Sequence, residues 1–160
     1  MLLRERSRAI PGSITRAVQS LLALVVVSGA AVLLTWLQQD EIILAWAQGN
    51  SSAQEILVTG GIDELRVSAI VPKFVPLAVV SYVVFVLLAV VLGAFLLDGH
   101  GWSRLVLTGT GLFGVLVAIL GLNHSLPTAF VVVSALFLVF CLTLMFFLWR
   151  RDASTYLRVN

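Results

Sequence analysis

The chain has 160 residues, of which 60% are hydrophobic and 11% are charged, and its formal net charge is +2. These values exclude an ordinary soluble domain and favour one membrane domain over residues 1–160, because apolar stretches take up most of the chain. The basic residues flank those stretches and form no basic face, so we expect no nucleic-acid partner.

Charge-poor apolar stretches predict four transmembrane helices. A hydrocarbon core about 30 Å thick needs about 20 apolar residues per helical crossing. The predicted spans are residues 18–37, 74–97, 102–122 and 127–149. The first span precedes an A-x-A match at residues 45–47, but its apolar run is too long for a signal peptide, so we expect a retained helix. The predicted fold class is an all-α membrane protein.

The distribution of basic residues predicts the orientation of these spans. Eight of them fall on one side of a four-span chain: Arg4, Arg6, Arg8, Arg16, Arg104, Arg150, Arg151 and Arg158. The connector 38–73 holds five acidic residues against Arg66 and Lys73. The positive-inside rule therefore predicts cytoplasmic termini and an outer loop at 38–73. The excess of arginine over lysine is typical of a GC-rich bacterial genome, so we expect a bacterial cytoplasmic membrane.

The outer loop predicts a short β-hairpin, because apolar and polar residues alternate on both sides of Gly60 and Gly61. A lone hairpin is only marginally stable in water, so it would rest on the helix ends or on a partner protein. Trp46 could lie flat on the membrane surface or pack beneath the loop. The candidate partner-contact residues of the loop are Trp46, Ile56, Val58 and Val67.

Small residues in the first and third spans predict close helix contacts. These helix-packing candidates are Ser28, Gly29, Thr110, Gly111, Gly114, Ala118 and Gly121. Spacing alone does not separate a partner helix inside the chain from one in another protein, and we favour packing inside the chain. Residues 109–114 match G-x-G-x-x-G, but they lack the preceding strand and following acid of a dinucleotide site.

The sequence indicates no catalytic, cofactor or metal site. The span interiors carry no ionisable side chain of the kind that pumps, transporters and intramembrane enzymes use. His100 and His124 fall in connectors on opposite sides of the membrane, so they cannot share a metal ion. Cys141 is the one cysteine and lies mid-span, where we expect an inert packing role. We therefore expect a protein that is not an enzyme.

Two segments carry a resemblance to a known group. Residues 101–108 hold a Trp-Ser-Arg sequence that opens the third span, and residues 149–158 hold a Trp-Arg-Arg-Asp-Ala sequence after the fourth. Over about residues 97–158 the chain resembles small actinobacterial integral membrane proteins. Some of these are accessory subunits of larger assemblies, including Mce-type lipid importers, so the resemblance implies larger integral membrane proteins as partners.

Two functional hypotheses follow from the sequence. The first is a noncatalytic accessory subunit of a larger bacterial membrane complex, a hypothesis that depends mainly on a hairpin in need of support. The second is a self-sufficient binder or carrier of a lipid or another apolar molecule, held between the helices without intramembrane charge.

Overall fold

The computed structural model describes residues 10–123 and 127–157, which contain seven helices and no strand. Four helices are long and apolar enough to cross a membrane, as predicted: α1 (Gly12–Leu37), α4 (Phe74–Leu97), α5 (Gly101–Asn123) and α6 (Thr128–Leu148). Four of the arginines used to predict orientation lie outside the described residues, as does His124. These arginines are Arg4, Arg6, Arg8 and Arg158.

The observed spans agree with the predicted ones except at the start of α1. Helix α4 has the predicted bounds, and α5 and α6 differ by one residue at each end. Helix α1 begins at Gly12, six residues earlier than predicted, because its first turns pack against a short helix α7 (Arg151–Leu157). Ile14, Ala17 and Ala153 are completely buried there.

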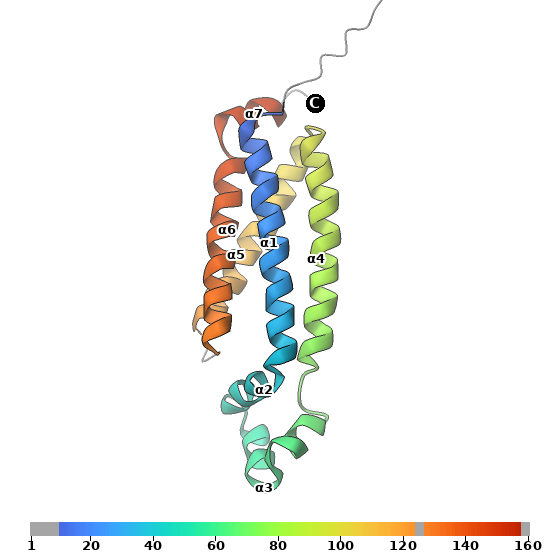
Figure 1. Cartoon of the computed structure of the whole chain (residues 1–160), viewed down its shortest axis with the longest axis vertical. Helices are drawn as coiled ribbons and strands as arrows, with labels where there is room; N and C mark the ends of the chain where they lie inside the picture. The colour runs from blue at the N-terminus through green and yellow to red at the C-terminus, as the bar shows by residue number, and fades with distance from the viewer. Residues whose placement is uncertain (1–9, 124–126, 158–160) are drawn as a thin grey trace, which may run out of the picture.

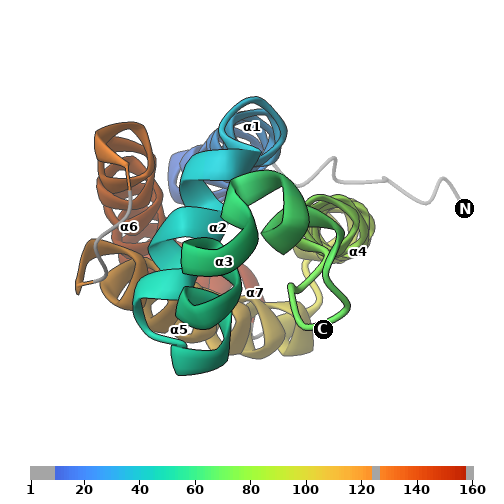
Figure 2. The same cartoon turned by 90° about the horizontal axis from the view of Figure 1, so that it is seen from below.

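The four long helices form a bundle in the order α1, α4, α5, α6 (Figures 1 and 2). Helix α1 packs extensively on α6 and α4, and α6 packs extensively on α5, whereas α4 touches α5 only lightly. Helix α7 lies at the upper end in Figure 1, which we call the α7 end. Helices α2 (Gln39–Gln48) and α3 (Ser51–Val67) lie across the opposite end.

The span surfaces are suited to lipid and not to water. Less than a quarter of each span's most apolar stretch is buried within the chain, and the fraction is 11% for α4. Outward-facing apolar side chains such as Val26, Leu87 and Phe146 are more than half exposed. Such helices are stable where hydrocarbon replaces water and each backbone group is bonded within its own helix.

The β-hairpin predicted around Gly60 and Gly61 is wrong, because residues 51–67 form helix α3. The Asn50 side chain caps this helix by accepting a hydrogen bond from the backbone N–H of Ala53 at 3.2 Å. Gly61 adopts φ +73° and ψ −170°, a non-helical conformation that kinks α3. The alternating pattern is short, so it is compatible either with two strands or with about two helical turns on each side of that kink.

Helices α2 and α3 bury a small core of their own. It consists of Ile43, Ala47, Ala53 and Leu65, with Trp46 and Phe74 packed against it. The Asp40 carboxylate and the Arg66 guanidinium also pair across the two helices at the surface. The outer segment is therefore a packed helical pair with a small apolar core.

Candidate functional site

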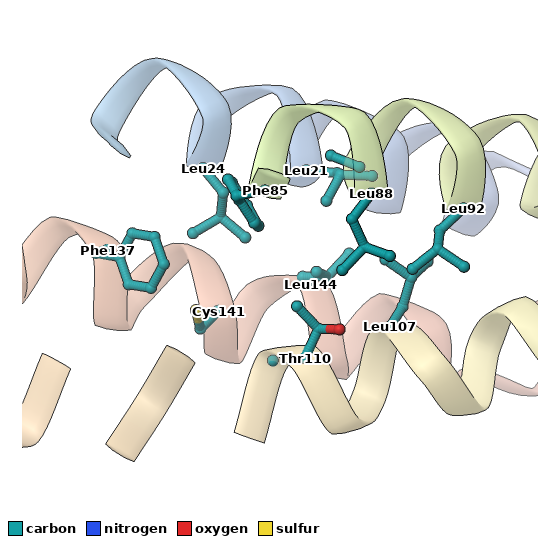
Figure 3. A pocket seen from close by; sticks show the side chains of 12 residues that line it. Leu21, Leu24, Phe85, Leu88, Leu92, Leu107, Thr110, Phe137, Cys141 and Leu144 are labelled. Atoms are coloured by element: carbon teal, nitrogen blue, oxygen red, sulfur yellow. The ribbon is translucent and has the colours of Figure 1, made fainter. Parts of the chain in front are cut away.

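The α7 half of the bundle is filled by leucine side chains from all four long helices (Figure 3). These residues are Leu21, Leu24, Leu88, Leu92, Leu107 and Leu144. They interdigitate so closely that only about 20 Å³ of free space remains between them, room for about one water molecule. This half of the core is closed.

The α2–α3 half of the same core contains a cavity of about 370 Å³, which we call the outer cavity. Seven of its sixteen lining residues have small side chains, and none is a leucine, whereas leucines fill the other half. The small lining residues are Ser28, Ala31, Ala78, Ser81, Gly114, Ala118 and Ser134, and the larger ones include Val32, Tyr82, Phe85, Val117 and Phe137. Phe85, Thr110 and Phe137 border both spaces and form the floor of the outer cavity.

The outer cavity lies inside the depth of the membrane spans. Tyr82 is eight residues into α4, about 12 Å from the start of that helix at 1.5 Å per residue. Ser134 is six residues into α6, about 9 Å from its start. Lining residues come from α1, α4, α5 and α6, and none comes from α2 or α3. The light contact between α4 and α5 leaves this side of the bundle the least covered by helix packing.

The small residues singled out in the sequence line this cavity or lie against α4 or α6. Ser28, Thr110, Gly114 and Ala118 line the outer cavity. A Cβ atom on Gly114 would lie 3.0 Å from the Cys141 sulfur. The other glycines of the set also lie against neighbouring helices. An added Cβ atom would be 3.3 Å from Met145 Cγ at Gly111, 2.7 Å from Ser134 Oγ at Gly121 and 3.1 Å from the Tyr82 hydroxyl at Gly29.

The cavity lining is uncharged, and half of its polar groups are already hydrogen-bonded to backbone. The hydroxyls of Ser28, Thr35 and Thr110 donate to carbonyl oxygens four residues back in their own helices, at 2.7, 2.8 and 3.0 Å. These bonds leave the walls largely apolar. Within residues 10–123 and 127–157, no three His, Cys, Asp or Glu side chains are grouped closely enough to hold a metal ion.

A polar network joins the helices at the α7 end. The Arg104 guanidinium donates to Ser154 Oγ at 2.9 Å and stacks 4.4 Å above the Trp149 ring. Trp149 Nε1 donates to Thr108 Oγ1 at 3.1 Å. The Tyr156 hydroxyl donates to the Leu97 carbonyl at 2.6 Å. The sequence analysis used the arginines after the fourth span only as an orientation signal and did not predict this network, although the apolar residues Ala153 and Leu157, four positions apart, were a signal for a helix.

The four loop residues predicted to contact a partner divide into two pairs. Trp46 and Ile56 are half-buried against the core of α2 and α3, and the Trp46 ring lies 6.5 Å from the Phe74 ring. Val58 and Val67 are 87% and 82% exposed. The first pair stabilises the outer segment itself, and only the second pair offers free surface.

The chain matches no protein-family model, no curated protein and no solved structure. The resemblance to actinobacterial membrane proteins stays a prediction. The geometry of the outer cavity is therefore the observation from which function is argued.

Proposed function

We propose that this protein binds an uncharged, largely apolar molecule in the outer cavity. The observation that supports this proposal is the contrast between the two halves of one core, since leucines fill one half and small residues leave about 370 Å³ open in the other. This volume lies at the lower end of the range of about 300–1,000 Å³ for small-molecule sites. It suits one ring system or one chain segment better than a whole two-chain phospholipid.

This proposal takes precedence over the accessory-subunit hypothesis because the main reason for the latter has been removed. The subunit hypothesis depended on a hairpin that needed a partner, whereas residues 51–67 are helical and pack on α2. Attachment to a larger complex stays a prediction, with the exposed Val58 and Val67 as its best-placed contacts.

The proposal includes an orientation in a bacterial cytoplasmic membrane. Arg16, Arg104, Arg150 and Arg151 belong to the α7 end, and acidic residues predominate in α2 and α3. The positive-inside rule then supports a cytoplasmic α7 end and cytoplasmic termini. The outer cavity would lie in the outer leaflet, with lateral access for a lipid-soluble molecule between α4 and α5.

Filling the cavity with a bulky side chain tests the proposal. We choose Ala78→Phe on α4 and Ala31→Phe on α1, because both positions line the outer cavity. Val80→Phe is the matched control, since Val80 lies on the same helix as Ala78 but is 61% exposed on the outer surface. The protein is extracted from native membranes in mild detergent, and bound small molecules are identified by mass spectrometry.

We expect the wild type and Val80→Phe to retain a common apolar molecule that both cavity variants lose. Two cavity variants on different helices guard against a folding defect in one of them, and thermal unfolding checks both. Equal retention in all four proteins would contradict the proposal. Larger membrane proteins in stoichiometric amount, with no bound small molecule, would favour the accessory-subunit hypothesis instead.

A further inference from the structure

We propose that the outer cavity recognises a neutral lipid by one hydrogen bond, which the Tyr82 hydroxyl donates to a carbonyl oxygen of the ligand. This inference rests on the proposed function and names the chemical class of its ligand. It comes from the position of Tyr82, the state of its hydroxyl and the absence of charge among the residues that line the outer cavity.

The Tyr82 side chain projects from α4 toward α1. Its hydroxyl lies 3.1 Å from the position that a Cβ atom on Gly29 would take. A larger residue at position 29 would therefore displace the ring, and glycine there makes room for the hydroxyl. Tyr82 also lines the outer cavity, so its phenol ring forms part of the wall.

The Tyr82 hydroxyl makes no hydrogen bond within the part of the chain that the structure describes, and it is not sealed from the cavity. Tyrosine hydroxyls that are removed from water usually find a partner. Tyr82 lies about 12 Å along α4 from its start, where lipid tails supply no hydrogen-bond partner. A hydroxyl without a partner costs about 1–3 kcal/mol. The neighbouring hydroxyls of Ser28, Thr35 and Thr110 donate to their own helices, whereas the shorter side chains of Ser81 and Ser134 line the cavity without such a bond. Tyr82 is thus a donor that a ligand can satisfy.

The lining also restricts the charge of the ligand. Among the residues that the structure describes, no Arg, Lys, His, Asp or Glu borders the outer cavity. A phosphate or ammonium group at this depth would lack a counter-charge and cost several kcal/mol. A carbonyl oxygen accepts a hydrogen bond without bringing a donor that would need its own partner. An isoprenoid quinone and a fatty acyl ester both carry such an oxygen on an apolar body.

The test compares matched probes on matched variants. Protein in nanodiscs is equilibrated with a methylnaphthoquinone or with methylnaphthalene, which has the same ring without oxygen. A second pair is methyl palmitate and hexadecane. The variant is Tyr82→Phe, and the control is Tyr156→Phe, because Tyr156 is the other tyrosine of the chain and donates to Leu97 at the α7 end. The amount of probe dissolved in the bilayer is the same for all variants. The ratio of bound probe between two variants therefore does not depend on that amount.

We expect the wild type and Tyr156→Phe to prefer a carbonyl probe over its hydrocarbon analogue. Tyr82→Phe should lose this preference by about two- to tenfold, the effect of one hydrogen bond, and bind the hydrocarbon as before. If the loss of preference is larger for the naphthoquinone pair, the ligand's carbonyl belongs to a ring; if it is larger for the palmitate pair, the carbonyl belongs to an ester. An unchanged preference in Tyr82→Phe would overturn the inference while leaving the proposed function intact. Failure of the wild type to bind any probe would overturn both.

Discussion

Replacing glycines of α5 by alanine should change stability with opposite signs at positions 109 and 114. A Cβ atom on Gly109 would meet nothing within 4 Å, whereas one on Gly114 would lie 3.0 Å from both Cys141 Sγ and Phe137 Cε1. Gly109→Ala should therefore gain about 0.5–1 kcal/mol of stability from helix propensity. Gly114→Ala gains the same amount but overpacks a closed contact, which costs about 1–3 kcal/mol. The two variants should differ by about 1–3 kcal/mol.

Thermal unfolding in one detergent measures this difference. For a chain of this size, 1 kcal/mol corresponds to about 2–4 °C, so Gly114→Ala should melt several degrees below Gly109→Ala. Gly111→Ala should lie between them, because the atom nearest its Cβ belongs to flexible Met145, at 3.3 Å. Adding Cys141→Ala to Gly114→Ala should restore part of the loss, a coupling that a double-mutant cycle detects. A Gly114→Ala protein as stable as Gly109→Ala would refute the packing argument.

Three further perturbations have defined outcomes. Gly61→Ala should lower the stability of α3 by about 1–3 kcal/mol, because Gly61 combines φ +73° with ψ −170°, a region that is essentially restricted to glycine. Hydrogen exchange in α3 measures this, and unchanged protection would contradict it. Arg104→Lys should lower the free energy of unfolding by about 0.5–2 kcal/mol, because an ammonium group cannot stack on the Trp149 ring and also reach Ser154. The near-ultraviolet circular dichroism of Trp149 should change, and an unchanged spectrum would argue against the stack. In a Cys141→Ala background, a membrane-impermeant maleimide should label Val58→Cys in intact cells and Asp152→Cys only after permeabilisation, and the reverse pattern would invert the proposed orientation.

The spans could be predicted from the sequence because one physical requirement, about 20 apolar residues per crossing, determines them. The fold of the outer loop could not, since a short alternating pattern around Gly60 fits a hairpin as well as a kinked helix. Deciding between the two required knowing that Leu65 packs on Ile43 of α2, a contact between distant segments. A local sequence pattern does not predict a contact between segments that are far apart in the chain.

The candidate site could be predicted only in part. The stripe that contains Gly114 and Ala118 stands out in the sequence, because small residues repeat every fourth position of a membrane helix. That pattern predicts close packing, yet a cavity arises where small residues from four helices meet at the same depth. Whether residues of four helices lie at the same depth depends on the tilt and vertical offset of each helix. The sequence does not show these, so it did not indicate Tyr82 on α4 as a site residue.

The size of the outer cavity implies that it does not stay empty. The cavity is open on the side where α4 and α5 touch only lightly, so lipid-soluble molecules of the bilayer can enter it. Water is a poor filler, because most of the lining is apolar and three of its six polar side chains already donate to their own helices. A lipid-soluble molecule is the remaining occupant at this depth. The closed leucine half and the Arg104 network then form a rigid base that keeps the helices together, whether or not the ligand is bound. Occupancy should consequently stabilise the α2–α3 half of the bundle more than the α7 half.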